Sequence, residues 1–241
     1  MTRPSTRPLV LYGDFTCPWS YLASRRVDAL TAGGVEVDWR AVESRAPGRS
    51  ARSGDRFTDL RADMELVVSG LLADERLPYC LAGFLPATTT GAVTGYAEAY
   101  AAGAAAPVRQ LLFDAFWVHG CDLGDARLVR TLVVDSVRSG SAPGTPRGDW
   151  GYPLTARGGP GAATARELVA RWTLEWRAAG IGRHPGPGPV LLHDAAAPLR
   201  GAAAVAWLGE ELTRRGLDPA TATPHASGCP GHHLDALPHA G

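Results

Sequence analysis

The chain reads LVLYGDFTCPWSYL over residues 9–22, and this segment joins an apolar run to the start of an amphipathic one. The apolar run at 9–12 ends at a Gly-Asp pair, which predicts a short buried strand. From Cys17 to Ala32 apolar residues recur at helical spacing, and Gly33-Gly34 predicts the end of that helix. Residues 35–42 alternate apolar and charged side chains, which is typical of a second strand. Strand, helix and strand in this order predict the start of a parallel α/β sheet.

The rest of the chain contains a helical block and a second α/β piece. Residues 44–56 and 140–160 lack periodicity and predict loops. We expect helices at 57–75, 90–106, 107–119, 125–138, 161–179 and 202–215, a strand at 190–192 and a return strand near 199. The predicted architecture is an α/β core formed by residues 1–50 and 151–216, an all-α helical insertion at 51–150, and a flexible tail at 217–241.

Composition excludes several classes of function. Lys+Arg and Asp+Glu both number 24, so no overall basic field predicts binding to nucleic acid or to an acidic membrane surface. No apolar run approaches the roughly 20 residues of a membrane span. Residues 1–8 are basic, but no long apolar segment follows them, so we expect no signal peptide and a cytoplasmic protein. The 4 cysteines then indicate chemistry or packing rather than a disulfide scaffold.

Cys17 stands where the first strand passes into the first helix. Unpaired N–H groups and the helix dipole favour negative charge at this position, so we expect the pKa of Cys17 to lie below the usual value of about 8.5. Pro18 suits a first helical turn, Trp19 can form a wall of the site, and Ser20 can donate its hydroxyl toward the sulfur. The alternative interpretation is a buried cysteine that only caps the helix.

Residues 14–22, DFTCPWSYL, resemble the active-site segment of DsbA-like thioredoxin-fold proteins, in particular the cytoplasmic FrnE-like branch. The resemblance extends over about residues 8–215 and includes the helical insertion. The chain is also similar to 2-hydroxychromene-2-carboxylate isomerases and kappa-class glutathione transferases, which share the insertion and carry Ser-Pro-aromatic-Ser at this place. The resemblance implies a thioredoxin-like fold with a helical insertion.

Ser20 departs from the Cys-x-x-Cys motif that the oxidoreductases of this family use. A serine cannot resolve a mixed disulfide, so the motif permits only monothiol chemistry. Cys17 could exchange with a small thiol or a protein disulfide, add to an electrophile, or position a thiol cofactor such as glutathione or a functional equivalent. Whether Cys80, Cys121 or Cys229 could act as a resolving thiol stays open.

The resemblance also implies a cis-proline beside the active cysteine, just before the third strand. Gly188-Pro189 occupies that place, although Pro185 and Pro187 compete for it and an ordinary turn is the alternative. We expect Gly188 and Pro189 to contact the substrate, together with Pro18 and Trp19. Without a side chain, Gly188 would leave room above the cysteine, which favours a small-molecule site.

Three further groups of residues have competing interpretations. Aromatic residues in the insertion either line a pocket over the site or form the core of a helical bundle; they are Phe113, Phe116 and Trp117. Arg25 and Arg26 fit a solvated helix face. The His- and Cys-containing segment 225–233 could bind a metal or be a disordered tail, and we assign no metal ligands to it.

The leading hypothesis is a monothiol oxidoreductase of the DsbA-like family, with Cys17 as nucleophile and Ser20 assisting it. The second is a glutathione-type thiol-dependent isomerase or transferase acting on an aromatic or quinone-like metabolite. The third is a non-catalytic thiol- or metal-binding protein. In each case we expect a small-molecule or thiol partner, no nucleic acid and no membrane, and the resemblance suggests a homodimer.

Overall fold

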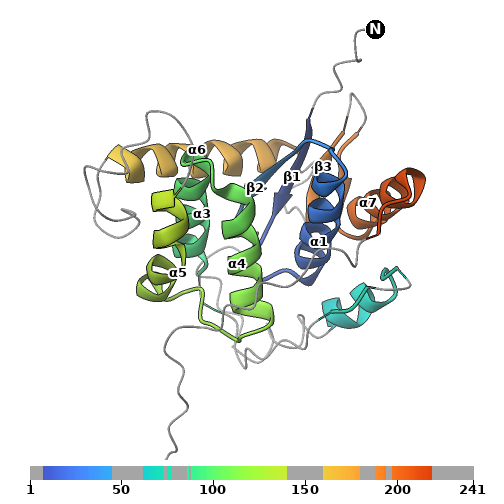
Figure 1. Ribbon diagram of the computed structural model, residues 1–241, viewed down its shortest axis with the longest axis horizontal. Coiled ribbons are helices and arrows are strands. Elements are labelled where there is room, and N and C mark those ends of the chain that lie inside the picture. Colours follow the sequence, from blue (N-terminus) through green and yellow to red (C-terminus); the bar gives the residue numbers. More distant parts are fainter. Residues whose placement is uncertain are drawn as a thin grey trace, which may run out of the picture.

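The computed structural model describes residues 8–44, 62–72, 75–77, 86, 88–139, 160–179, 188–193 and 197–218. A helical stretch at 62–68 falls within the helix expected at 57–75. Figure 1 shows the labelled elements. In chain order they are β1 (Leu9–Gly13), α1 (Pro18–Ala32), β2 (Val37–Ala41), α3 (Thr90–Ala101), α4 (Ala105–Trp117), α5 (Ala126–Ser139), α6 (Pro160–Ala179), β3 (Val190–Leu192), β4 (Leu199–Arg200) and α7 (Ala202–Arg215).

The strands form one mixed sheet in the order β2-β1-β3-β4. β1 pairs in parallel with β2, whereas β3 is antiparallel to both β1 and β4. Two distant parts of the chain therefore meet in the centre of the sheet, where Tyr12 faces Val190. This confirms the thioredoxin-like α/β architecture with two core pieces separated by helices.

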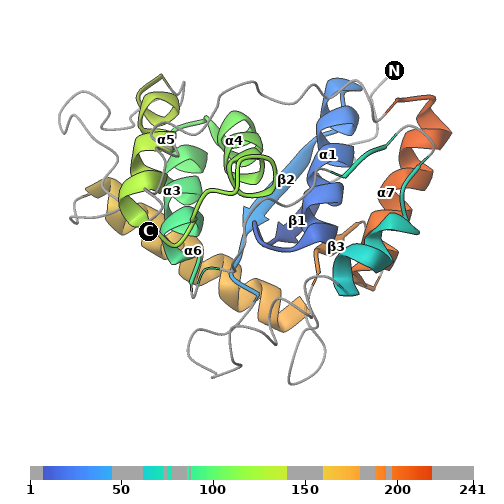
Figure 2. The same ribbon diagram turned by 90° about the horizontal axis from the view of Figure 1, so that it is seen from below.

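The two faces of the sheet are covered by different helices. α1 and α7 pack together on one side, and α6 runs along the other (Figures 1 and 2). The alternation of strand side chains explains this division. Tyr12 and Arg40 are cross-strand partners and both bond Glu175 of α6, at 3.0 and 2.6 Å. Trp39 points the other way and contacts Phe113 of α4.

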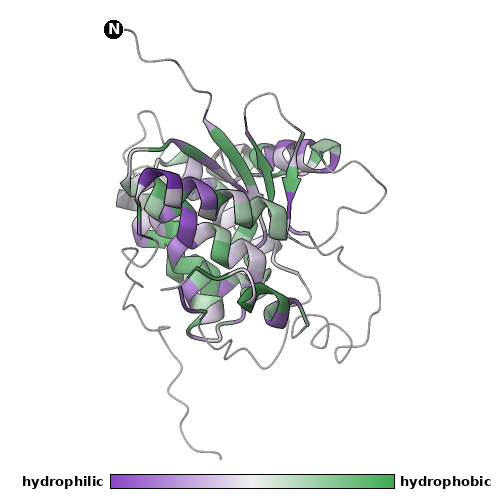
Figure 3. Cartoon of the chain, turned by 90° about the vertical axis from the view of Figure 1, so that its right-hand side faces the viewer, coloured by the Kyte–Doolittle hydropathy of each residue, from purple (hydrophilic) through white to green (hydrophobic). Residues whose placement is uncertain are grey.

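The insertion helices α3, α4 and α5 pack on one another, and α3 also contacts α6 and β2. Figure 3 shows that the helices of the molecule carry both hydrophobic and hydrophilic residues, as expected for helices with one buried face. Asp125 caps α5 by accepting the N–H of Arg127 at 2.8 Å. Glu43 caps α3 by accepting the N–H of Thr89 at 2.8 Å, so the residues after β2 hold the insertion in place.

Candidate active site

Cys17 is the N-cap residue of α1, and Pro18 stands in the first turn. The Cys17 carbonyl accepts the N–H of Tyr21 at 3.0 Å, and its own N–H donates to the Asp14 carbonyl at 3.1 Å. The predicted position of the cysteine, between the first strand and the first helix, is therefore confirmed. The tight turn from Asp14 to Cys17 fixes where the sulfur lies.

The Cys17 side chain makes no capping hydrogen bond at the start of α1. The backbone N–H groups of Trp19 and Ser20 and the Ser20 hydroxyl act only to lower the pKa of the thiol. The Ser20 Oγ accepts the N–H of Asp14 at 3.1 Å, so Ser20 lies in the turn that holds Cys17. The predicted donation from the Ser20 hydroxyl to the sulfur stays a prediction.

The expected low pKa of Cys17 is wrong. The residue is buried, with only 1% of its surface exposed. Burial raises the pKa of the thiol to about 12, and the negative charge of Asp14 adds to this effect. The neighbouring Ser20 and Trp19 lower the pKa of the thiol, but burial outweighs them. The thiol at this helix start is consequently protonated at neutral pH.

Asp14 is a buried carboxylate that organises the turn before Cys17. Its Oδ1 accepts the N–H and the hydroxyl of Thr16, both at 2.8 Å. Its Oδ2 accepts the N–H of Ser44 at 2.8 Å and the Ser44 hydroxyl at 2.7 Å. The carboxylate therefore ties the Cys17 turn to the residues that follow β2.

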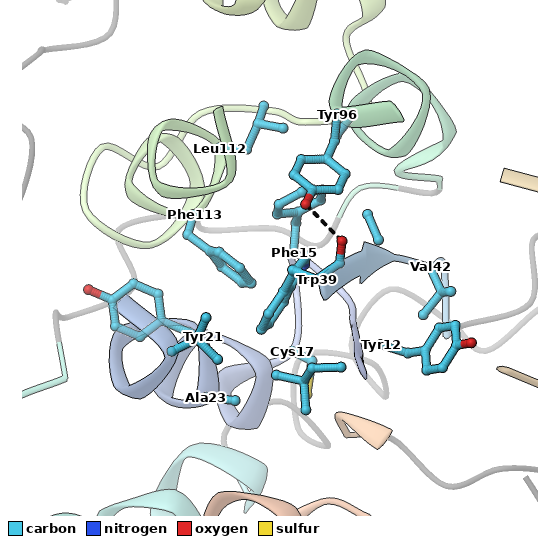
Figure 4. Close-up of a cluster of buried hydrophobic side chains, with 14 of the residues drawn as sticks. Tyr12, Phe15, Cys17, Tyr21, Ala23, Trp39, Val42, Tyr96, Leu112 and Phe113 are labelled. Atoms are coloured by element: carbon cyan, nitrogen blue, oxygen red, sulfur yellow. Dashed lines mark hydrogen bonds between the residues drawn. The ribbon is translucent and has the colours of Figure 1, made fainter. Parts of the chain in front are cut away.

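The insertion also holds this turn. The indole N–H of Trp117 in α4 donates to the Phe15 carbonyl at 3.0 Å. The Phe15 ring packs edge-on against Phe113 at a centroid separation of 5.0 Å. Figure 4 shows Phe15, Phe113 and Cys17 in one buried cluster with Tyr21 and Tyr96. Phe113, Phe116 and Trp117 are all buried, so the core interpretation of these aromatic residues is confirmed.

Trp19 packs against Gly70. A Cβ placed on Gly70 would lie 3.3 Å from the Trp19 ring, so a side chain there would push the ring away by a few tenths of an ångström. Arg26 holds the chain at Gly70 by donating to its carbonyl at 2.7 Å and to both carboxylate oxygens of Glu75 at 2.8 and 2.6 Å. It also donates to the Val205 carbonyl of α7 at 2.6 Å.

The position of Arg26 in the sequence suggested a solvated helix face, and for Arg26 this prediction is wrong. Its side chain is 1% exposed and that of Glu75 is 5% exposed. The prediction fails because the partner carboxylate lies 49 residues away along the chain, outside any local pattern. Arg25, its neighbour in α1, is only half-buried.

Gly188 and Pro189 precede β3 as expected, but the bond between them is trans, so the expected cis-proline is wrong. Gly188 has a φ of 135° in the region that favours glycine, and a Cβ there would lie 2.7 Å from the Gly201 Cα. Its lack of a side chain is thus explained by close backbone packing rather than by room for a ligand. The Pro189 carbonyl accepts the Gly201 N–H at 2.9 Å. Pro185 and Pro187 lie outside the described residues.

Cys17 is a free thiol, whereas Cys121 is buried and disulfide-bonded. The expectation that the cysteines serve only chemistry or packing is therefore wrong for Cys121, which is not available as a free resolving thiol. Cys80, Cys229 and the segment 225–233 lie outside the described residues. In the part of the chain that is described, no group of three or more His, Cys, Asp or Glu side chains could hold a metal.

Sequence reasoning gave no role to Asp14 and none to Ser44 or Glu75. Asp14 lies within the quoted motif, so its position was visible but its partners were not. Ser44 stands at the start of a predicted loop and Glu75 at the end of a predicted helix, and neither carries a signal of its own. Among the described helices, none is long and apolar enough to cross a membrane.

The chain is similar to a known domain family and to several solved structures. The sequence model of the DSBA-like thioredoxin domain matches residues 9–136, more than half of the 241 residues. A 2-hydroxychromene-2-carboxylate isomerase structure is 19% identical, with a TM-score of 0.58, over 86% of this chain and 95% of that one. The cytosolic disulfide reductase DsbM from Pseudomonas aeruginosa is 16% identical, with a TM-score of 0.49, over 86% of this chain and 98% of that one.

No curated protein sequence matches the chain. At such low identity the structural likeness to the isomerase shows the fold alone. The family match, in contrast, covers the strand, the Cys17 motif, the first helix and most of the insertion. The chain therefore belongs to the DSBA-like thioredoxin domain family.

Proposed function

We propose that the protein is a monothiol enzyme of this family that exchanges disulfides with low-molecular-weight thiols at Cys17. The observation that carries the proposal is a free Cys17 thiol at the N-cap of α1, followed by Pro18 in the first turn. The positive end of the helix dipole stabilises negative charge that develops on this sulfur during exchange. Ser20 stands where a second thiol would be needed for a dithiol cycle.

The proposed reaction has two exchange steps. In the first, the Cys17 sulfur attacks one sulfur of a small disulfide, a new S–S bond forms and the old one breaks. The proton of the Cys17 thiol passes to the departing thiolate, so the first product leaves as a thiol. In the second step a second small thiolate attacks the mixed disulfide and releases Cys17, which regains a proton. The cycle needs no resolving cysteine within the chain.

The burial of Cys17 supports a small substrate rather than a protein disulfide. A sulfur that is 1% exposed can meet a small molecule after a limited movement, whereas a folded protein substrate needs a wider opening. Pro18 and Trp19 from α1 would contact the small disulfide on one side, and Gly188 and Pro189 on the other. The small thiol would be glutathione or a functional equivalent.

The test is to incubate the reduced protein with glutathione disulfide or cystine and to locate adducts by peptide mass spectrometry. The proposal expects one adduct on Cys17, removed again by the matching thiol. Cys17→Ser should abolish this adduct. Ser20→Cys is a matched control, because it supplies a resolving thiol and should stop the adduct from accumulating. Failure of wild-type Cys17 to form an adduct with either disulfide would contradict the proposal.

A second candidate function is favoured by the raised pKa of Cys17. A thiol with a pKa of about 12 is a neutral hydrogen-bond donor at neutral pH, as a serine hydroxyl is. Such a group could orient the sulfur of a bound thiol cofactor in an isomerase or transferase acting on an aromatic or quinone-like metabolite. Cys17→Ser separates the two candidates, because this second activity would survive the substitution and disulfide exchange would not.

A cytoplasmic location and a homodimeric state stay predictions. Size-exclusion chromatography with light scattering would give the number of subunits. Fractionation of the source cells would give the location.

A further inference from the structure

A short segment of the chain, which we call the strap, packs on the first turn of α1. It consists of residues 62–72 and 75–77 and begins with a helical stretch at 62–68. Figures 1 and 2 show this stretch beside α7 and near the start of α1. The contact with α1 is direct, because a Cβ placed on Gly70 would lie 3.3 Å from the Trp19 ring. The strap thus lies against the residue next but one to the reactive thiol.

The strap also contributes to the burial around that thiol. Val67 is 0% exposed and belongs to the hydrophobic cluster that includes Cys17 and Trp19. Because Cys17 is itself 1% exposed, a reagent reaches the sulfur only after part of the protein moves. The neighbouring part that moves at the lowest free energy then sets the access to the sulfur.

Two other neighbours of the Cys17 turn are held by extensive contacts. β1 lies inside the sheet and pairs with β2 on one side and with β3 on the other. α4 is fixed to the turn by the Trp117 indole, which donates to the Phe15 carbonyl, and by contacts between aromatic rings. Moving either element would disrupt the packed core, and such openings have free energies close to that of global unfolding.

The strap has less support. Its helical stretch is shorter than the roughly 12–15 residues that an isolated helix needs for marginal stability. Leu66 and Val68 remain 59% and 58% exposed, so burial of these side chains contributes little. The Arg26 guanidinium donates one hydrogen bond to the Gly70 carbonyl and two to the Glu75 carboxylate, at 2.6–2.8 Å. A buried ion pair therefore ties an element of low intrinsic stability to α1.

We propose that the strap is a gate for Cys17: it opens locally when the Arg26–Glu75 pair separates, and this opening admits the substrate to the sulfur. Segments of low local stability commonly serve as lids over reactive sites. The inference rests on the proposed function, because it describes how a small disulfide reaches Cys17. Alkylation measures this access without any disulfide, so the two proposals can fail separately.

The first test uses the wild-type protein in 0 and 1 M urea. It compares alkylation of Cys17 by iodoacetamide, quantified by mass spectrometry, with amide hydrogen exchange in the strap and in β1. Gly70 is a suitable strap amide, because its N–H donates to the Val67 carbonyl at 2.9 Å. Local opening exposes little surface, so alkylation and strap exchange should rise less than about threefold, whereas exchange in β1 should rise about thirtyfold. Alkylation that rises as steeply as exchange in β1 would overturn the gate.

The second test breaks the ion pair. Glu75→Gln should speed Cys17 alkylation about a hundredfold, and exchange at the Gly70 N–H by a similar factor, as expected for a broken buried pair. Val133→Ala is the matched control, because this residue is 0% exposed in α5, which packs on α3 and α4. It weakens the whole fold rather than the strap, and should change Cys17 alkylation less than about threefold. Equal rates in the two variants, or an unchanged rate in Glu75→Gln, would overturn the gate.

The results also separate the gate from the proposed function, and the wild-type test decides the matter even if Glu75→Gln does not fold. If alkylation follows the strap and no small disulfide forms an adduct, the exchange reaction fails and the gate stands. If Cys17 forms the adduct but its alkylation follows global unfolding, the gate fails and the exchange reaction stands.

Discussion

Glu75→Gln should destabilise the protein by about 3 kcal/mol, because it leaves a buried guanidinium without its counter-charge. Arg26 and Glu75 have side chains that are 1% and 5% exposed, and two hydrogen bonds of 2.8 and 2.6 Å join them. The Gly70 and Val205 carbonyls still accept from Arg26 in the variant, so the loss belongs at the lower end of the 3–5 kcal/mol typical of broken buried pairs.

Urea unfolding followed by circular dichroism would measure this loss, and the melting temperature should fall by about 6–12 °C for a chain of this length. Because the pair holds Gly70 against Trp19, Cys17 should also be alkylated faster in the variant. Arg171→Gln is the matched control. Its partner Glu175 is 3.9 Å away, Arg171 is 60% exposed, and we expect a loss below about 0.5 kcal/mol. A loss below about 1 kcal/mol for Glu75→Gln would refute the reasoning.

Three further variants test other parts of the account. Gly188→Ala should lower the free energy of unfolding in urea by about 1–3 kcal/mol, because φ at this residue is 135° and the new Cβ would lie 2.7 Å from the Gly201 Cα. An unchanged free energy of unfolding would contradict the close packing. Trp117→Phe should lower the free energy of unfolding by about 1–3 kcal/mol, because it removes the indole N–H that donates to the buried Phe15 carbonyl. An unchanged urea midpoint of unfolding would contradict that hydrogen bond. Cys17→Ser should lessen alkaline destabilisation. The pKa of the Cys17 thiol is about 12 in the folded protein and 9.0 ordinarily. As the pH rises, the unfolded chain therefore loses this proton first, and the free energy of unfolding falls between about pH 9 and 12. Equal alkaline slopes in both proteins would refute the burial argument.

Much of the fold could be predicted from the periodicity of apolar residues and from the glycines that end helices. The strand at 9–12, the helix after Cys17 and the C-terminal helix lie within a residue or two of their observed bounds. Local signals are sufficient there, because an apolar stripe and a glycine stop act within a few residues. The helix expected at 107–119 is an exception: α4 spans Ala105–Trp117, so Pro107 lies in its first turn and not at its start.

The candidate site was only partly predictable. The position of Cys17 at the helix start follows from local helix geometry, so the motif was enough to predict it. The burial of the sulfur depends on contacts made by distant segments, and the motif contains no information about those. A dipole argument for a low pKa assumes a solvated helix end, and the folded protein removes that solvent.

The same reason explains the other errors. Arg26 lies on a helix that reads as amphipathic, but its partner Glu75 comes from the far side of a loop. The missing side chain of Gly188 suggested room for a ligand, but in the structure the backbone of Gly201 packs closely against Gly188. Long-range pairing decides each of these positions.

The central claim is that Cys17 is a free, buried and protonated thiol at the start of α1. The most direct test is the rate of Cys17 alkylation by iodoacetamide between about pH 6 and pH 10, with free glutathione as the exposed reference thiol. The account predicts a rate below that of glutathione throughout, and a rise with pH that shows no plateau before about pH 9. A plateau at neutral pH, with Cys17 reacting faster than glutathione, would contradict it.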